Sequence, residues 1–444
     1  MTSYRSKTNN LSLLTLAAAI LLPTLTLSLA QSGFDYEEAP IKYSASAPKD
    51  PIATLQKRID SGEISLKWDE HTGYLVSLLQ RLVISGSSQM LVFSKTSFQR
   101  EWISPDRPRA LYFNDQNYVG FVQGAPVLEI TSVDPQLGSV FYILEQDKNR
   151  KPKFLRQTHE CLQCHDSNMA GGVPGLVMRS VYTRRDGQPE LRNGSFITSD
   201  QSPFQERWGG WYVTGTHGSM RHLGNIMVSG NDTNSSLDME RGANVTDLKK
   251  LVDTQPYINR NSDIVALMVS EHQIKLGNLI TRANFQTRMA LDYEKRLKSE
   301  LGYPTQTRLD SVSARIHSAT ESLVEGLLMC KEERLTAEIK GTSGYTENFA
   351  SHGPRDTKGR SLRDFDLRSR LFMYPCSYMI YSEAFDGLPA ESREYVYLRM
   401  YDVLSGKDTS EKFAHLSPED RKTIFEVLKD TKPSFAAWVS QHGK

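Results

Sequence analysis

Residues 89–147 read QMLVFSKTSFQREWISPDRPRALYFNDQNYVGFVQGAPVLEITSVDPQLGSVFYILEQD. Short runs rich in Val, Ile, Tyr and Phe alternate here with Gly, Asn, Asp and Pro, which is typical of β-strands joined by tight turns. The clearest runs are residues 90–93, 110–113, 118–121 and 140–144. We therefore expect a β-rich N-terminal region over residues 31–150.

Helical patterns lie on both sides of this region. Two helices are expected between about residues 52 and 85, and helices dominate again from residue 241 to residue 444. Ser262 can cap a long helix that runs through the 290s, a second helix is expected over about 309–339, and Ser417-Pro418-Glu419-Asp420 has the composition of a helix start. The expected fold class is α+β, with a β-rich N-terminal half and a helical C-terminal half.

The segment between them, residues 151–240, is rich in glycine and irregular in pattern. A hairpin is expected around residues 180–183, with Asp186-Gly187 near its turn. We expect a loop-rich middle region.

Composition places few limits on function. The chain has 444 residues, 39% apolar and 24% charged, which is ordinary for a globular protein. The formal net charge of +1 gives no electrostatic reason to expect nucleic acid as a partner.

The N-terminus predicts export from the cytoplasm. Arg5 and Lys7 precede an uncharged run over residues 11–29, which ends in the small residues of Ser28-Leu29-Ala30. This is the layout of a secretory signal peptide over residues 1–30, and it implies a periplasmic or otherwise exported protein. An uncleaved N-terminal membrane anchor is the alternative, and no later segment is apolar enough to span a membrane.

The motif that carries chemistry is Cys161-Leu162-Gln163-Cys164-His165. Two thiols three residues apart, followed at once by a histidine, form the attachment signature of c-type haem: the thiols bind the haem vinyl groups and His165 binds the iron. With four cysteines and ten histidines in the chain, chance placement of this pattern is about one in a thousand. Structural zinc and a catalytic dithiol are the rival interpretations, although export and the adjacent histidine favour haem.

The sequence leaves several candidates for the second axial ligand of such a haem. His217 is the first choice, because Gly215 and Gly218 beside it allow the backbone to approach a flat ring. The alternatives are His222, His272 and Met220, and an iron with no second protein ligand. A lone histidine on an apolar helix face, such as His272, is usually a hydrogen-bonded core residue.

The CxxCH motif makes the chain resemble c-type cytochromes as a class. At greater length it resembles large exported bacterial proteins with a single haem-attachment site, through residues 104–113, residues 208–217 and the run Tyr374-Pro375-Cys376-Ser377-Tyr378. This resemblance implies one covalent haem and export, and it implies no substrate. Dihaem peroxidases of similar size carry two CxxCH motifs, where this chain has one.

Three functions are compatible with such a motif. The first is electron transfer to a redox partner protein, the second is a haem enzyme with an open distal side where His217 or His222 acts with Arg221, and the third is a haem-based sensor. Electron transfer is preferred, because the motif supports redox chemistry and no substrate site is evident. The remaining cysteines, Cys330 and Cys376, form either a disulfide or two buried thiols.

Overall fold

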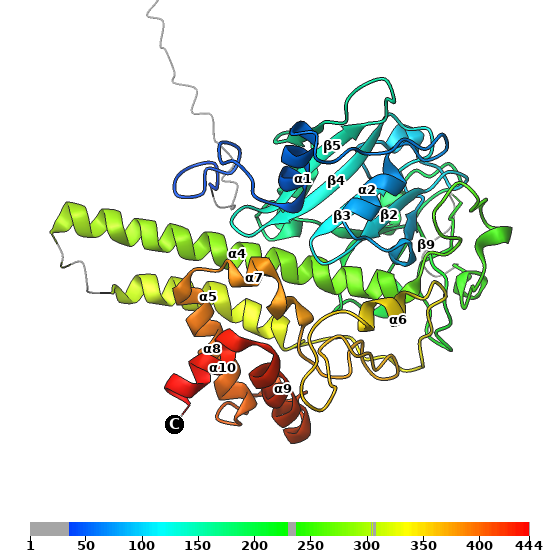
Figure 1. Ribbon diagram of the computed structural model, residues 1–444. Coiled ribbons are helices and arrows are strands. Elements are labelled where there is room, and N and C mark those ends of the chain that lie inside the picture. The colour runs from blue at the N-terminus through cyan, green and yellow to red at the C-terminus, as the bar shows by residue number, and fades with distance from the viewer. Residues whose placement is uncertain (1–34, 230–236, 303, 305–307, 444) are drawn as a thin grey trace, which may run out of the picture. The chain divides into compact units, whose positions relative to one another are not determined.

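An antiparallel sheet forms the centre of the N-terminal half (Figure 1). The computed structural model describes residues 35–229, 237–302, 304 and 308–443, so the expected signal peptide lies outside the described residues. Within them, seven strands pair in the order β6-β5-β4-β3-β2-β1-β9. Their bounds are β1 Met90–Val92, β2 Arg109–Phe113, β3 Asn117–Phe121, β4 Val127–Asp134, β5 Gly138–Glu145, β6 Phe154–Gln157 and β9 Trp211–Tyr212.

One face of this sheet is covered by two short helices, α1 (Pro51–Asp60) and α2 (Leu75–Arg81). Side chains alternate between the faces of a strand, so Leu128 and Ile130 of β4 face the same way, and both are buried with Ile52 of α1 and Leu78 of α2. The expected strands and both expected N-terminal helices are confirmed. Both β-rich and helical halves are present, so the α+β class is confirmed as well.

The opposite face lies against a long helix, α4 (Ile264–Leu301), and α5 (Asp310–Leu327) packs alongside it (Figure 1). Phe113 and Tyr118 on this face are buried in one core cluster with Ile264 and Val265. The sheet therefore has apolar layers on both sides, as an α+β fold requires.

The N-cap of α4 differs from the expected one. Asp263 caps the helix, because its Oδ1 accepts the backbone N–H groups of Val265 and Ala266 at 2.8 and 3.3 Å. The Ser262 hydroxyl instead donates to the Tyr212 carbonyl at 2.6 Å, and thereby ties the start of α4 to β9. The helix itself runs through the 290s as expected and ends at Gly302, whose φ of +68° suits glycine.

The second long helix is shorter than expected. We predicted a helix to about residue 339, but α5 ends at Leu327. Met329 and Lys331 have φ values of +53° and +63°, which a right-handed helix cannot contain, so residues beyond this point form irregular loops.

The C-terminal part contains the short helices α6 (Tyr345–Ala350) and α7 (Glu383–Asp386), followed by α8 (Ala390–Leu404), α9 (Pro418–Thr431) and α10 (Pro433–His442). The helix start at Ser417 is confirmed: its hydroxyl accepts the Asp420 N–H, and the Asp420 carboxylate accepts the Ser417 N–H. In the described part of the chain, no helix is long and apolar enough to cross a membrane.

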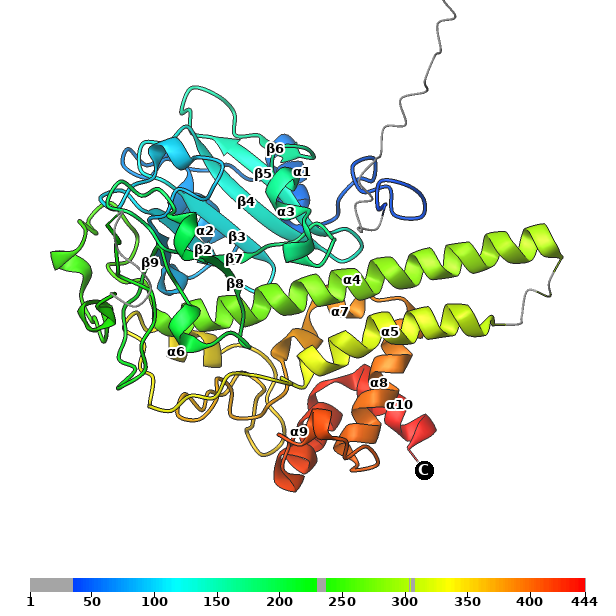
Figure 2. The same ribbon diagram turned by 180° about the vertical axis from the view of Figure 1, so that it is seen from behind.

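The middle region holds α3 (Leu162–His165) and a two-stranded sheet of β7 (Met178–Val181) and β8 (Ser195–Thr198) (Figure 2). The expected turn at Asp186-Gly187 forms, since the Gly187 N–H donates to the Arg184 carbonyl at 2.9 Å. The partner of β7, however, is β8, which follows fourteen residues later and not directly after the turn.

Candidate haem-attachment site

The CxxCH motif folds into a single helical turn. The Cys161 carbonyl accepts the N–H groups of Cys164 and His165 at 3.2 and 3.0 Å. Residues three apart lie on one side of such a turn, so the two thiols are neighbours. Cys161 is half-buried, Cys164 is exposed, and both are free thiols. This spacing and accessibility are what attachment of one ring to two thiols requires.

The His165 imidazole is held in a defined tautomer. Its Nδ1 lies 3.0 Å from the Gly175 carbonyl oxygen, which can only accept, so Nδ1 carries the proton and Nε2 keeps the lone pair. The ring stacks on Phe141 of β5 with centroids 4.9 Å apart. Burial lowers the pKa of His165, so the imidazole is neutral at pH 7. A neutral imidazole whose other nitrogen donates to a backbone carbonyl is the usual state of a metal-ligating histidine.

Helix α4 positions the acceptor of this hydrogen bond. The Asn278 side-chain amide donates to the Leu176 carbonyl at 2.8 Å and so fixes the backbone next to Gly175. Phe141 comes from the sheet and Gly175 from the loop after α3, so the His165 ring is oriented by elements that are distant in sequence.

The sheet beside this turn presents a half-covered row of three apolar residues, one glycine and one glutamate. Five residues in register across β2 to β6 share one face: Leu111, Gly120, Glu129, Ile143 and Leu155. All but the glycine are half-buried, and the row lies next to Phe141 under His165. Arg109 reaches across Gly120 to form an ion pair with Glu129.

These residues fit a covalently attached haem. The two thiols are free and adjacent, Nε2 of His165 has a lone pair, and the half-covered row with Leu111, Ile143 and Leu155 lies alongside. The Nε of Arg109 and the Oε1 of Glu129 are also buried without a hydrogen-bond partner, which is unusual unless another group completes the site. Arg109, Glu129, Phe141 and Gly175 were not identified from the sequence. The available signal was the strand pattern, because alternate residues such as Arg109 and Leu111 share one face.

The structure does not bring His217 to His165. The Nδ1 of His217 donates to the Met220 carbonyl at 2.7 Å, and its Nε2 accepts the Asn244 N–H at 2.9 Å. Both ring nitrogens are therefore occupied, and the side chain is fully buried. His217 follows β9, which is five strand spacings, about 24 Å, from β5 across the sheet. The expectation that His217 is the second iron ligand is corrected by these contacts.

His222 and Met220 are neighbours of His217. The His222 ring is 4.6 Å from that of His217 and 5.2 Å from that of Trp208, and burial lowers its pKa to about 3. The Met220 sulfur accepts the Thr336 N–H at 3.5 Å. Both residues therefore lie beside His217, on the β9 side of the sheet and away from His165.

His272 is part of a buried polar network. Its Nδ1 is 2.7 Å from Asp200 Oδ2, and its Nε2 is 2.7 Å from the Ser377 hydroxyl. Lys275 also binds Asp200, at 2.7 Å. The Ser–His–Asp distances match those of a hydrolytic triad, but His272 and Ser377 are 0% exposed and Asp200 is 3% exposed. We therefore assign the network a structural role, which agrees with the expectation of a hydrogen-bonded core histidine.

The other two cysteines are separate buried thiols. Cys330 and Cys376 are both free, and both belong to the core cluster around α4 and α5. Cys161 packs against a different core cluster, which includes Phe141 and Leu162. A zinc site on this CxxC would need two more ligands, and Cys330 and Cys376 lie in another core cluster.

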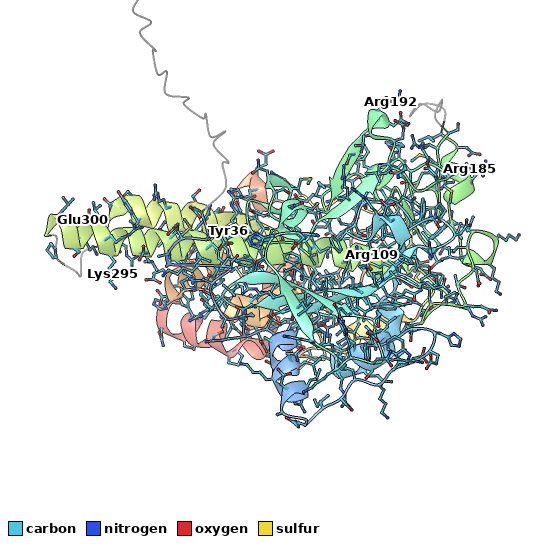
Figure 3. All side chains as sticks on the ribbon, turned by 90° about the horizontal axis from the view of Figure 1, so that it is seen from above. Tyr36, Arg109, Arg185, Arg192, Lys295 and Glu300 are labelled. Atoms are coloured by element: carbon cyan, nitrogen blue, oxygen red, sulfur yellow. The ribbon has the colours of Figure 1, made fainter. Side chains whose placement is uncertain are left out.

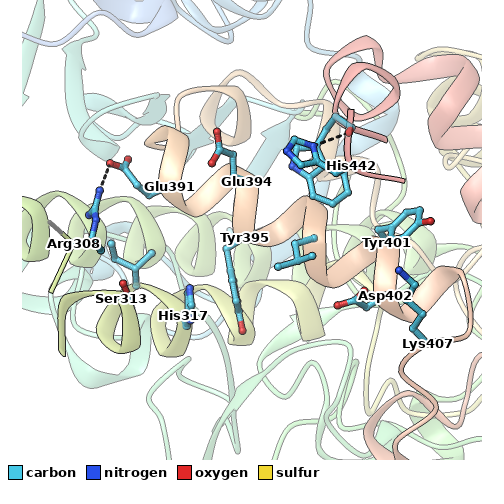
Figure 4. Close-up of a pocket in the computed structure, with 13 residues that line it drawn as sticks. Arg308, Ser313, His317, Glu391, Glu394, Tyr395, Tyr401, Asp402, Lys407 and His442 are labelled. Carbon is cyan, nitrogen blue, oxygen red and sulfur yellow. Dashed lines mark hydrogen bonds and ion pairs between the residues drawn. The ribbon is translucent and has the colours of Figure 1, made fainter. Parts of the chain in front are cut away.

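A separate cavity of about 530 Å³ lies between α5, α8 and α10 (Figure 4). Two stacked pairs line it: His317 with Tyr395, at 4.1 Å between ring centroids, and Trp438 with His442, at 4.7 Å. The cavity belongs to the helical half and includes no residue of the CxxCH turn.

Comparisons of the chain with protein-family models, with curated proteins and with solved structures gave no significant match. The function is therefore inferred from the chemistry of the attachment turn and its surroundings.

Proposed function

We propose that this chain is an exported c-type cytochrome that carries one covalent haem and takes part in electron transfer. The observation that carries the proposal is the His165 tautomer, in which Nδ1–H donates to Gly175 and Nε2 is left as a ligand atom. In this role the Cys161 and Cys164 thiols would each add S–H across one haem vinyl double bond, and His165 would hold the iron. Haem supplies a reversible one-electron couple when bound.

The surrounding residues restrict the orientation of the His165 imidazole. Phe141 and the Gly175 carbonyl hold the orientation of the His165 imidazole, so the fold would present Nε2 to a bound iron in one fixed orientation. A rigid ligand favours electron transfer, because little reorganisation accompanies the gain or loss of an electron. The proposed partner is a redox protein in the same exported compartment, and the net charge of +1 gives no reason to invoke nucleic acid.

A haem enzyme with an open distal side is the second candidate. It is favoured by one observation: His217, His222, His272 and Met220 are all engaged elsewhere in the core. An iron bound only by His165 would leave its other axial position to a small oxidant or other ligand. In that case Arg221 would not assist, because it pairs with Glu240 at 2.7 Å.

Expression of the full chain in cells competent for cytochrome c maturation tests the proposal. We expect the purified protein to gain the mass of one haem and to show the sharp reduced bands of a thioether-linked haem. Magnetic circular dichroism and cyanide binding then separate the candidates: a low-spin, cyanide-resistant ferric iron supports electron transfer, whereas a high-spin iron that binds cyanide quickly supports the enzyme. A chain without haem mass, or with zinc on Cys161 and Cys164, would falsify both.

Replacing His217 by alanine should leave the haem spectrum unchanged and lower stability. The change removes two buried hydrogen bonds to backbone groups, at a cost of about 1–3 kcal/mol. Absorption spectra of the oxidised protein and urea unfolding measure the two effects. The same change at exposed His352 serves as the control, with neither effect expected. A change of spin state in His217→Ala would restore this residue as an iron ligand.

A further inference from the structure

An ion pair crosses three strands beside the attachment turn. Arg109 lies on β2 and Glu129 on β4, and Gly120 of β3 lies between them (Figure 3 labels Arg109). A Cβ added to Gly120 would come within 2.7 Å of the Arg109 guanidinium. The missing side chain of Gly120 is therefore what allows the two charges to meet.

The pair is incompletely satisfied. The side chains of Arg109 and Glu129 are 19% and 14% exposed, yet Arg109 Nε and Glu129 Oε1 are buried with no hydrogen-bond partner. Taking charges out of water is costly, and the attraction within a pair offsets this cost only when the remaining donors and acceptors are also satisfied. A pair of this kind is a poor stabilising device, so its presence next to a reactive turn points to a functional role.

Both charges lie close to the attachment turn. In the strand register, Glu129 is the diagonal neighbour of Phe141, at about 7–8 Å, and Phe141 stacks on the His165 ring. The pair therefore lies within electrostatic range of the iron ligand, in a partly water-excluded site.

We propose that the Arg109–Glu129 pair sets the reduction potential of a haem bound at Cys161, Cys164 and His165. This inference rests on the proposed function. Oxidised iron carries one more positive charge than reduced iron, so Glu129 favours the oxidised state and Arg109 favours the reduced state. With both charges present the two effects largely cancel. Arg109 and Glu129 thus act on the reduction potential through their charges, without touching the iron. Their influence is strong because the low local dielectric screens them weakly.

Single substitutions should shift the potential in opposite directions. Arg109→Gln leaves Glu129 unbalanced and should lower the potential, whereas Glu129→Gln leaves Arg109 unbalanced and should raise it. We expect each substitution to change the ratio of oxidised to reduced protein at a fixed potential about tenfold. This change corresponds to a shift in reduction potential of about 59 mV for one electron. The double variant should return close to the parent value. Equilibrium redox titration of the haem-loaded full chain, followed by absorption, measures all four proteins.

Two controls separate charge from structure. Glu63→Gln removes one charge from the exposed Arg58–Glu63 pair next to α1 and should leave the potential unchanged. Arg109→Lys keeps the positive charge, so its potential should lie much closer to that of the parent than the potential of Arg109→Gln does. A purely structural role of the arginine would not produce this difference. If Arg109→Gln does not accumulate, the rise in Glu129→Gln and the rescue by Arg109→Lys still decide the question.

The outcomes also distinguish this inference from the proposed function. Full haem incorporation in every variant, with potentials unchanged or shifted in the same direction, overturns the role of the pair and leaves the cytochrome proposal intact. Absence of haem from the parent chain overturns the proposed function itself. Shifts of opposite sign that cancel in the double variant support the inference.

Discussion

Replacing Cys161 and Cys164 together by serine is expected to abolish covalent haem attachment, from one haem per chain to none. In the proposed function both thioether sulfurs come from the α3 turn, and the described structure holds the other two cysteines in a different core. Serine hydroxyls are poor nucleophiles toward a vinyl group, so no other bond replaces the lost ones. Intact mass after expression with cytochrome c maturation, together with haem staining of a denaturing gel, measures the effect.

Cys330→Ala is the matched control, because it removes one thiol away from the motif and should keep full haem loading. The paired single variants, Cys161→Ser and Cys164→Ser, should each retain at most one thioether bond and a reduced yield. Haem that stays covalently bound in the double variant would mean that attachment does not use this turn, and the proposed function would then be lost.

Replacing Asp200 by asparagine is expected to be the most destabilising of the conservative substitutions in the core, by about 3–5 kcal/mol. The Asp200 carboxylate binds Lys275 and His272 at 2.7 Å each, and its backbone carbonyl accepts from Arg207 at 3.1 Å. Neutralising it leaves Lys275 close to the core without its partner charge. Urea unfolding at pH 7, followed by circular dichroism, measures the loss of free energy.

The control is Asp186→Asn, which removes a carboxylate from an exposed pair with Arg184 at 3.5 Å and should cost less than about 1 kcal/mol. A loss at Asp200 no larger than this would show that the buried network contributes little to stability.

The same carboxylate predicts a pH dependence. Burial alone would raise the pKa of Asp200, but Lys275 and His272 outweigh burial and hold this pKa well below its usual range. A carboxyl with a depressed folded-state pKa contributes stability that is fully present above its unfolded pKa, near 3.9, and is lost as the pH falls below it. Parent stability should therefore fall as the pH drops below about 4, and Asp200→Asn should show a shallower fall over that range. An equal slope in both proteins would contradict this assignment.

Much of the fold followed from local sequence patterns. The β-strands over 90–144 were predicted because alternation and turn residues lie within a few positions of one another. The helix start at Ser417 was predicted for the same reason, since a capping box is complete within four residues. The cap of α4 was misassigned by one residue, because Ser262 and Asp263 are both good caps and only the contact of Ser262 with Tyr212 separates them. The end of α5 was missed because no glycine or proline marks the reversal at Met329.

The candidate site divides in the same way. Cys161, Cys164 and His165 were identified from spacing, and the structure places them on one turn with a ligand-ready imidazole. His217 was chosen for its flanking glycines, yet Gly215 and Gly218 instead allow close packing of the backbone near Lys340 and Ala337. Glycines beside a histidine therefore look the same in the sequence whether the backbone approaches a haem or packs closely in the core.

The sequence by itself determined the CxxCH motif, the α+β class and most element positions, because each depends on residues close together in the chain. Only the tertiary structure decided which carbonyl fixes the His165 tautomer, that Arg109 meets Glu129 across Gly120, and that four candidate ligands are occupied elsewhere. Apart from the bond of His217 to Met220 three residues later, these contacts join residues that are ten to more than one hundred positions apart. Their partners are selected by strand register and helix packing, for which no local pattern exists.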